Sequence, residues 1–417
     1  MSDINNKKAI LVTIAESGAM LDECERSLGE LERLLNTAGG ECFAKVIQVK
    51  DKFDPRTCIG KGKVAEIGEM CKNNDVTLVV FDFELSPVQI RNLENDIGDV
   101  TVIDRSMLIL DIFALHAVSG EGKLQVELAQ LKYSAPRLTG KGIELSRQGG
   151  GIGSRGPGET KLETDRRHLH EKIVSLEKKL AELEHNRSVM RAQRDRSGLC
   201  KVALVGYTNA GKSTLLNRLT DASVLVEDKL FATLDPTTRK LELPCGESIL
   251  LTDTVGFIRK LPHHLVKAFK STLDEVTYAD VLLIVSDVND SEAPEHIEVT
   301  KNVIADLGSS DKPIIYVYNK CDKSETFIPG VISENSVAIS AVTGEGIDDL
   351  IKIIEAEIHK GKKSVTLIIP YAEQHALSAL YNIYTVNSVD YLDEGISVSV
   401  VLDAKGIGQY KKYICEV

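Results

Sequence analysis

The stretch CKVALVGYTNAGKST, residues 200–214, decides the fold of this chain. Its apolar first half predicts a buried strand, and the segment from Gly206 to Thr214 matches G-x-x-x-x-G-K-[ST] and leads into the helical pattern LLNRL. In such a loop, backbone N–H groups wrap phosphates at a helix N-terminus. Lys212 is then placed to reach the terminal phosphates and Ser213 to face Mg²⁺. The stretch predicts a P-loop nucleotide-binding domain.

Three further motifs follow predicted strands in the order that a guanine-nucleotide domain requires. Asp253-Thr-Val-Gly256 follows SILLT, and its carboxylate and glycine N–H suit the Mg²⁺ shell and the γ-phosphate. Asn319-Lys-Cys-Asp322 follows PIIYVYN; Asp322 can accept hydrogen bonds from N1–H and N2–H of guanine, a donor pair that adenine lacks. Ser340-Ala341 follows SVAI, where backbone can reach the guanine O6. Together they predict GTP binding.

A mobile switch is expected at FATLDPTTR, residues 231–239, between the first and second motifs. The spacing alone leaves Thr233, Thr237 and Thr238 open as the threonine that joins the Mg²⁺ shell. The full set of expected GTP-binding residues is Gly206, Tyr207, Thr208, Asn209, Ala210, Gly211, Lys212, Ser213, Thr214, Phe231, Ala232, Thr233, Leu234, Asp235, Asp253, Thr254, Val255, Gly256, Asn319, Lys320, Cys321, Asp322, Ser340 and Ala341.

Phe257 occupies the position where many GTPases carry a glutamine that orients the attacking water. A phenyl ring cannot hydrogen-bond a nucleophile, so we expect slow hydrolysis by the chain alone. Two activators are conceivable: a partner that orders the switches, or a K⁺ ion held against the phosphates near Asn209. Asn209 acting only as a loop-shaping hydrogen-bonding residue is the alternative. The expected catalytic set is Lys212, Thr233, Gly256 and Asn209.

Composition bounds the class of protein. The chain has 417 residues, of which 43% are hydrophobic and 27% charged, which fits two to four globular domains. The longest aliphatic run, near residues 281–285, is too short for a membrane helix, and the N-terminus MSDINNKK lacks an apolar signal region, so we expect a cytoplasmic protein. The eight cysteines form no C-x-x-C pair, which suggests neither a zinc site nor a disulfide framework.

One segment is basic although the chain carries a net charge of −12. Residues 137–196 hold 14 Lys and Arg against 9 Asp and Glu, and they include the glycine-rich stretch GGGIGSRGPGETKLETDRR at 149–167. Its G-x-G-x-x-G pattern lacks the preceding buried strand of a dinucleotide site. A phosphate-rich partner and a plain solvated helix face both remain open on charge alone.

The rest of the chain reads as an α/β protein. Strand-like KKAILVTIA, CFAKVIQV and VTLVVFDF alternate with helical patterns, which predicts a largely parallel N-terminal sheet. From Leu169 to Met190, apolar residues recur at heptad-like spacing, which predicts an antiparallel helical hairpin with the helix of LQVELAQLKY. We expect an N-terminal α/β domain at 1–136, the glycine-rich and helical segment at 137–198, the P-loop GTPase domain at 199–362 and a small α+β domain at 363–417.

These motifs resemble the HflX family of ribosome-associated GTPases over essentially the whole length, most specifically in the glycine-rich stretch, FATLDPTTR and the N-terminal DPRTCIGKGK. The resemblance implies binding to the large ribosomal subunit, separation of stalled or idle ribosomes into subunits, and GTP hydrolysis that is faster on the ribosome. It implies that Thr233 is the magnesium-linked threonine, and Phe257 fits the hydrophobic residue that the family has in place of the glutamine. The expected contacts to ribosomal RNA are Arg147, Arg155, Lys161, Arg166 and Arg167.

Three other functions share parts of this pattern. A GTPase of tRNA modification or ribosome assembly would share the nucleotide motifs but not the glycine-rich stretch. An ATP-driven RNA remodelling enzyme lacks support, because the only adjacent Asp-Glu pair of the domain, Asp274-Glu275, does not follow a buried strand. A regulatory module without turnover is compatible with Phe257. We expect a monomer that uses Mg²⁺, and leave open whether the N-terminal IGKGK segment binds a second nucleotide.

Overall fold

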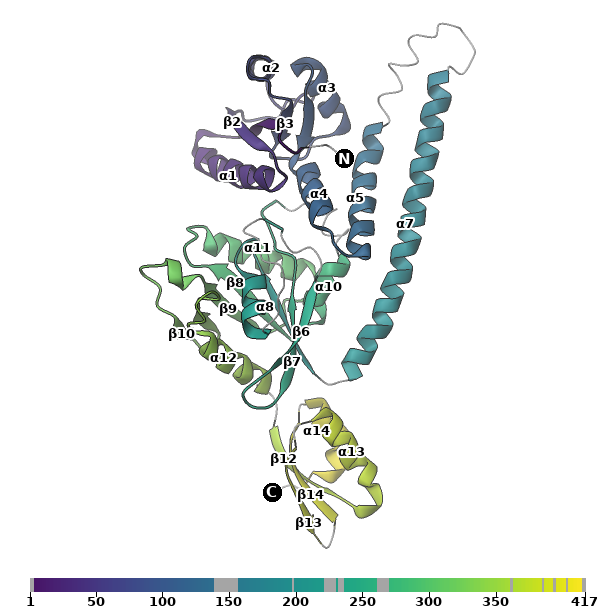
Figure 1. Cartoon of the computed structure of the whole chain (residues 1–417), viewed down its shortest axis with the longest axis vertical. Helices are drawn as coiled ribbons and strands as arrows, with labels where there is room; N and C mark the ends of the chain where they lie inside the picture. Colours follow the sequence, from purple (N-terminus) through teal and green to yellow (C-terminus); the bar gives the residue numbers. More distant parts are fainter. Residues whose placement is uncertain are drawn as a thin grey trace. The chain divides into compact units, whose positions relative to one another are not determined.

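The computed structural model describes residues 4–138, 157–196, 199–220, 230–231, 236–260, 270–360, 363–384, 386–392, 395–402 and 404–414. The chain divides into two compact units. The first comprises residues 1–183 together with 227–235 and 260–271, and the second comprises the remaining residues. Three sheets are present in the described part of the chain, one in the first unit and two in the second (Figure 1).

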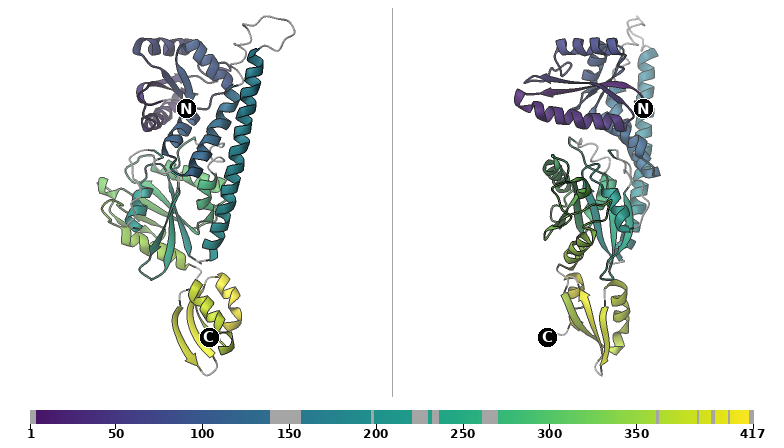
Figure 2. Two further views of the ribbon diagram at one scale, coloured as in Figure 1. Left: turned by 45° about the vertical axis from the view of Figure 1, so that its right-hand side comes forward. Right: turned by 60° about the vertical axis from the view of Figure 1, so that its left-hand side comes forward.

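The sheet of the first unit is entirely parallel, as the alternation of strands and helices predicts, in the order β2-β1-β3-β4. Helix α1 lies on one side of it, and α2 and α3 lie on the other (Figure 2). Apolar side chains on both faces are buried, which is typical of a parallel sheet covered on each side. The elements are β1 (Lys8–Ala15), α1 (Leu21–Thr37), β2 (Glu41–Val49), α2 (Lys61–Asn74), β3 (Leu78–Phe81), α3 (Pro87–Ile97) and β4 (Thr101–Asp104).

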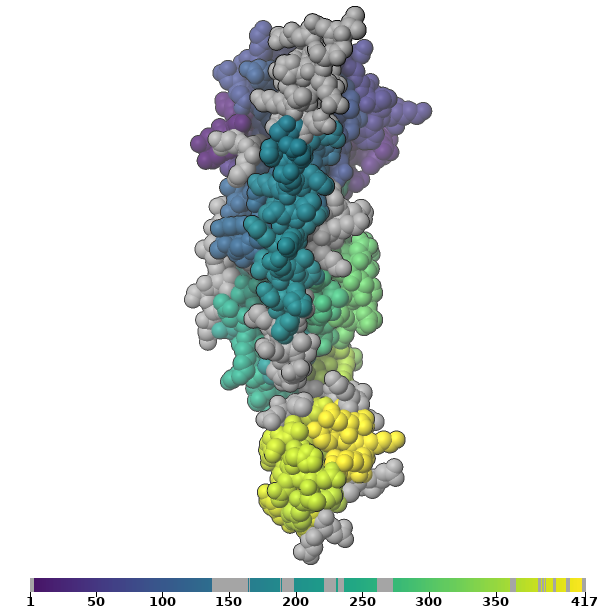
Figure 3. Space-filling model, turned by 90° about the vertical axis from the view of Figure 1, so that its right-hand side faces the viewer, coloured from purple at the N-terminus to yellow at the C-terminus, as the bar shows by residue number. Residues whose placement is uncertain are grey.

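Three helices follow this sheet in the described residues: α4 (Arg105–His116), α5 (Gly120–Leu138) and α7 (Pro157–Arg196). Helices α5 and α7 run antiparallel (Figure 1), and ion pairs join Lys132 to Glu177 at 2.7 Å and Lys172 to Glu127 at 2.6 Å. The helical hairpin predicted from the apolar spacing is therefore confirmed. Figure 3 shows the outer surface of α7 in teal. Residues 139–156, with Arg147 and Arg155, lie outside the described residues.

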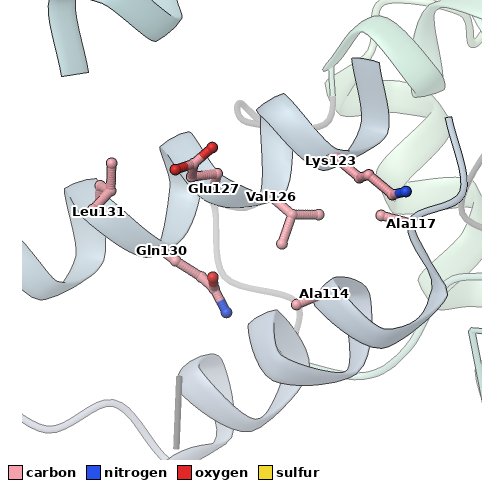
Figure 4. Close-up of a pocket in the computed structure, with 7 residues that line it drawn as sticks. All are labelled: Ala114, Ala117, Lys123, Val126, Glu127, Gln130 and Leu131. Carbon is pink, nitrogen blue, oxygen red and sulfur yellow. The ribbon is translucent and has the colours of Figure 1, made fainter. Parts of the chain in front are cut away.

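A cavity of about 360 Å³ lies between α4 and α5 (Figure 4). Its walls are mainly apolar, and its two charged side chains are Lys123 and Glu127, of which Glu127 already pairs with Lys172. The lining residues are Ala114, Ala117, Lys123, Val126, Glu127, Gln130 and Leu131. None of them belongs to a nucleotide-binding motif.

The large sheet of the second unit has the order β10-β11-β9-β8-β5-β7-β6. Its five inner strands are parallel, whereas the edge strands β6 and β10 pair antiparallel with their neighbours. The strands are β5 (Cys200–Gly206), β6 (Thr237–Glu242), β7 (Ser248–Asp253), β8 (Val281–Asp287), β9 (Ile314–Asn319), β10 (Gly330–Ser333) and β11 (Ser336–Ala338). The helices are α8 (Lys212–Thr220), α10 (Lys270–Tyr278), α11 (Ala293–Asp306) and α12 (Ile347–His359).

A small antiparallel sheet closes the chain, in the order β12-β14-β13. Leu367, Leu380 and Val398 are buried in its separate core. Its elements are β12 (Lys363–Ile369), α13 (Gln374–Ile383), β13 (Val386–Leu392), β14 (Gly395–Leu402) and α14 (Ala404–Gln409). The mixed α/β fold class predicted from sequence is confirmed. Within the described ranges, no helix has the length and apolar character needed to span a membrane.

A buried ion cluster ties the helices of the first unit to its sheet. Arg105, at the start of α4, donates to Asp82 at 2.8 Å and to Glu30 at 2.7 Å, and its side chain is 2% exposed. Ser27 and Lys260 donate to the second oxygen of Asp82, at 2.6 and 2.7 Å. Burial opposes ionisation of Asp82, but Arg105 and Lys260 hold its pKa below the ordinary value. Asp82 is thus a buried, charged and fully bonded carboxylate.

Replacing Arg105 by Met should destabilise the first unit by roughly 3–5 kcal/mol, because two buried carboxylates lose their shared partner. Native-state hydrogen exchange of the β3 amides in the full chain measures this opening free energy. Arg56→Met is the matched control: it breaks an ion pair with Asp96 in which Arg56 is 50% exposed, and it should cost about 0–1 kcal/mol. Equal costs for the two variants would contradict the prediction.

Candidate nucleotide-binding site

The carboxyl ends of neighbouring parallel strands bring the four motifs together. Gly206 ends β5, Asp253 ends β7 and Asn319 ends β9, while Ser340 follows β11 two residues after its last residue. Strands β11, β9, β8, β5 and β7 are consecutive neighbours in the sheet. Ligands of open α/β sheets bind at this edge, outside the carboxyl ends of the strands.

Lys212 begins α8 and is buried within its own loop. Its Nζ donates to the carbonyls of Gly206 at 3.1 Å and Tyr207 at 2.9 Å. Burial lowers the pKa of Lys212 to about 8, an effect that the nearby Asp253 carboxylate partly opposes. The two carbonyls and the neighbouring carboxylate therefore do not fully offset the cost of burying the ammonium charge. A phosphate bound beside it would favour the charged form.

Ser213 of α8 and Asp253 at the end of β7 form a hydrogen-bonded pair of oxygen-bearing side chains. The Ser213 hydroxyl donates to Asp253 Oδ2 at 2.5 Å. The other carboxylate oxygen, Oδ1, is buried and has no hydrogen-bond partner in the part of the chain that the structure describes. Burial raises the pKa of Asp253, against the opposing effects of Lys212 and Ser213. Mg²⁺ prefers oxygen ligands and retains bound waters that need acceptors, so this pair fits the ion.

Asn319 links the P-loop to the loop after β11. Its Nδ2 donates to Ala210 O at 2.9 Å, and its Oδ1 accepts from Ala341 N at 3.0 Å. Gly211 has φ +94°, and a Cβ there would lie 2.2 Å from Asn319 Nδ2, so only glycine fits. One buried amide thereby fixes the distance between the phosphate side and the base side of the site.

Asp322 is exposed at the base side, where its Oδ1 accepts from the Ser340 hydroxyl at 2.6 Å. Lys320 adopts the left-handed conformation, with φ +69°, and its Nζ lies 2.8 Å from Asp287. The buried Cys321 donates its N–H to Ile339 O at 3.1 Å. The base-side loop is held from several directions while the Asp322 carboxylate stays open to solvent.

Phe257 is packed inward and is 1% exposed. Its N–H donates to Gly206 O at 3.1 Å, and its carbonyl accepts from Thr208 N at 2.9 Å. Gly256 beside it leaves no room for a side chain, since a Cβ would lie 2.8 Å from Thr208 Cα. The side chain expected to replace the usual glutamine therefore forms part of the core and cannot contact a water at the phosphates in this conformation.

The switch segment is described only in part. Phe231 belongs to the first unit, is 3% exposed and packs edge-on against Phe113 of α4, with ring centroids 4.7 Å apart. Thr237 and Thr238 lie on β6, where the Thr238 hydroxyl is hydrogen-bonded to Thr252 at 2.9 Å. Ala232, Thr233, Leu234 and Asp235 lie outside the described residues.

Sequence patterns did not indicate several residues that flank the P-loop. Arg259 donates to Glu292 at 3.0 Å, and His296 stacks on the ring of Tyr207 with a centroid distance of 3.6 Å. Glu292 and His296 lie more than thirty residues beyond Arg259 and match no motif. Only the fold shows that they lie beside the P-loop.

The sheet and the four motifs define the class of P-loop GTPases, and the comparisons give the family. Family models match residues 25–114 and 116–194 as the N-terminal and middle regions of a GTP-binding GTPase, 201–320 as a 50S ribosome-binding GTPase, and 330–409 as the HflX C-terminal domain. The protein named GTPase HflX in Caldanaerobacter subterraneus subsp. tengcongensis is 50% identical, over 94% of this chain and 90% of its own length. The chain belongs to the HflX family of GTPases.

The chain is also similar to a second relative and to a solved structure. The GTPase HflX of Lacrimispora saccharolytica is 48% identical over 95% of this chain and 94% of its own length. A solved structure described as the complex of SsGBP with GDP aligns with a TM-score of 0.46 and 25% identity, over 84% of this chain and 98% of that one.

The buried ammonium yields a prediction about pH. In the nucleotide-free protein, the folded-state pKa of Lys212, about 8, lies below its ordinary value of 10.5. The cost of burying its charge is therefore complete below pH 8 and disappears as the pH rises toward 10.5. The free energy of unfolding of Lys212→Met minus that of wild type should therefore be about 2 kcal/mol larger at pH 7.5 than at pH 10.

Urea unfolding followed by circular dichroism at several pH values measures this difference. Lys178→Met, at an exposed lysine on α7, is the control and should show a difference from wild type that does not change with pH. A pH-independent difference between Lys212→Met and wild type would show that burial does not depress the ionisation of Lys212.

Proposed function

We propose that this GTPase binds the large ribosomal subunit and uses GTP to separate stalled or idle ribosomes into subunits. The observation that carries the proposal is membership of the HflX family across nearly the whole chain, with residues 201–320 matching a model described as a 50S ribosome-binding GTPase. Its place of action is the cytoplasm, and its active form is the monomer.

The described contacts of Lys212, Ser213 and Asp253 support specific roles in hydrolysis, and the family resemblance adds Thr233. Lys212 would hold the β- and γ-phosphates, Ser213 and Thr233 would hold Mg²⁺, and Asp253 would act beside them as an acceptor. Gly256 donates its N–H to the γ-phosphate, and Asp322 reads guanine. The bound Mg²⁺ would supply charge neutralisation at the phosphates. Because Phe257 is buried, the attacking water must be oriented by something other than that side chain.

The ribosome is the proposed activator, because it can order both the switch segment at 231–239 and the loop that carries Gly256. We expect the chain alone to hydrolyse GTP slowly and purified large subunits to raise the rate by an order of magnitude or more. Steady-state hydrolysis of GTP and ATP, with and without large subunits, tests this. An unchanged GTP rate would refute ribosome activation and favour a target in ribosome assembly or tRNA modification; equal GTP and ATP rates would favour RNA remodelling.

Potassium is the second candidate activator, through Asn209 at the P-loop. The same assay repeated in K⁺ and Na⁺ buffers separates the two. A rate that is higher in K⁺ without ribosomes would support a K⁺ ion at the phosphates. Equal rates in the two buffers would leave Asn209 with only its structural part in the loop.

The start of α7 offers exposed positive charge for ribosomal RNA. Arg166 and Arg167 are exposed. The proposed RNA contacts also include Lys161, which is a residue of α7, and Arg147 and Arg155, which precede the helix in the sequence. Each cation that neutralises a phosphate adds to affinity through release of counterions and makes binding depend on salt.

The double variant Arg166→Glu/Arg167→Glu should weaken binding to large subunits at least tenfold, because four units of charge change where phosphates are contacted. GTP affinity should stay within about twofold of wild type, since neither residue belongs to a nucleotide motif. Sedimentation with large subunits measures the first quantity, and nucleotide titration the second. Lys178→Glu/Lys179→Glu reverses the same number of exposed charges farther along α7. Equal binding losses for the two double variants would argue against a specific contact.

A further inference from the structure

A cluster of aromatic and charged side chains of the second unit flanks the P-loop. The Tyr207 ring stacks on the His296 imidazole, with centroids 3.6 Å apart and planes inclined by 10°. The Tyr207 hydroxyl also accepts a hydrogen bond from the backbone N–H of Arg259, at 2.8 Å. A P-loop side chain therefore contacts both the segment after Gly256 and helix α11.

Arg259 attaches that segment to α11 a second time. Its guanidinium donates to Glu292 at 3.0 Å through one nitrogen and to Glu295 through the other. Glu292 directly precedes α11, and Glu295 lies in its first turn. The Arg259 and Glu292 side chains are only 15% and 16% exposed, so the pair is screened less by water than a surface ion pair.

His296 is held by the same group of carboxylates. Its Nδ1 lies 3.0 Å from Asp290 and its Nε2 lies 3.9 Å from Glu292. The imidazole is 6% exposed, so its position under Tyr207 is set by packing and by these two neighbours. Glu292 lies near both Arg259 and His296, so the ion pairs and the Tyr207–His296 stack form one connected group.

The anchored segment is the one that carries Gly256. The N–H and the carbonyl of Phe257 are hydrogen-bonded to Gly206 and Thr208 of the P-loop. Gly256, the preceding residue, packs so closely that an added Cβ would lie 3.0 Å from Lys212 Nζ. After Phe257, the Ile258 side chain is buried, and Arg259 is the next residue with polar contacts to the P-loop and α11. The position of the Gly256 backbone beside Lys212 is thus bounded on both sides by contacts to the P-loop or to α11.

We infer that Arg259 is a positioning residue: held by Glu292, Glu295 and the Tyr207 hydroxyl, it fixes the Gly256 N–H where the γ-phosphate of GTP is bound. The inference deepens the proposed function and rests on the proposed contact between Gly256 and the γ-phosphate. GDP has no γ-phosphate, so the anchor favours GTP over GDP without touching either nucleotide. Loss of the anchor leaves the segment free to adopt other conformations, which lowers the fraction of protein ready for GTP.

The test compares the affinities for a non-hydrolysable GTP analogue and for GDP, with single-turnover hydrolysis as a second readout. Arg259→Met should weaken analogue binding about tenfold and slow hydrolysis, while GDP affinity stays within about twofold of wild type. Arg259→Lys keeps the charge but not the fork that spans two carboxylates, so it should restore only part of the loss. Lys352→Met, at an exposed ion pair on α12, is the matched control and should change neither affinity.

Two other variants keep the inference testable if Arg259→Met folds poorly. Tyr207→Phe removes only the hydroxyl that accepts from Arg259 and preserves the ring stack, and it should weaken the GTP analogue selectively. Glu292→Gln should do the same. Combining Arg259→Met with Glu292→Gln should weaken analogue binding less than the product of the two single effects, because both remove one interaction.

The outcomes separate this inference from the proposed function. Equal weakening of GTP-analogue and GDP binding in Arg259→Met, or no change in either, would overturn the positioning role. A wild-type protein that bound neither nucleotide would instead overturn the proposed site itself. Selective, non-additive loss of analogue binding supports the anchor.

Discussion

The nucleotide-binding site depends on the two hydrogen bonds of the Asn319 side-chain amide. The amide donates to the P-loop carbonyl of Ala210 and accepts from Ala341, and so joins the phosphate-binding loop to the loop near the base. Both partners are backbone groups, so the buried Asn319 side chain is the one side chain in this link. Asn319 sits at the end of β9, two strands away from β5 in the sheet, and the sheet spacing sets where its amide reaches.

The two units bury charge in opposite ways. In the first unit, Arg105 and Lys260 balance Asp82 and Glu30, and the pKa of Asp82 is lowered. In the second, Lys212 is buried so deeply that its pKa falls to about 8. In the cluster of the first unit, each buried carboxylate lies within ion-pair distance of a cation, which fits a structural role. The incompletely compensated ammonium gains its stabilisation when a phosphate arrives, which is typical of a binding group.

Local sequence was sufficient for much of the fold. Strands β1, β2 and β3 follow from aliphatic runs, and α5 and α7 from apolar spacing, because a buried parallel strand and a helix stripe each require a recognisable pattern. No pattern in the sequence predicts strands β4, β6, β10 and β13 individually. They are short or lie at sheet edges, where few buried side chains leave a pattern, and their existence depends on pairing with distant strands.

For the site, the sequence by itself determined which residues carry chemistry: a glycine loop ending in Lys212, and Asp253, Asn319 and Asp322 at predicted strand ends. These are local signals, because each motif must supply its own turn and its own functional group. The tertiary structure alone decided that Phe257 is buried and that Asn319 reaches Ala210. It also decided that Arg259 and His296 meet around Tyr207. Such contacts join residues that lie far apart in the chain, and no local pattern records which distant surfaces the folded sheet brings together.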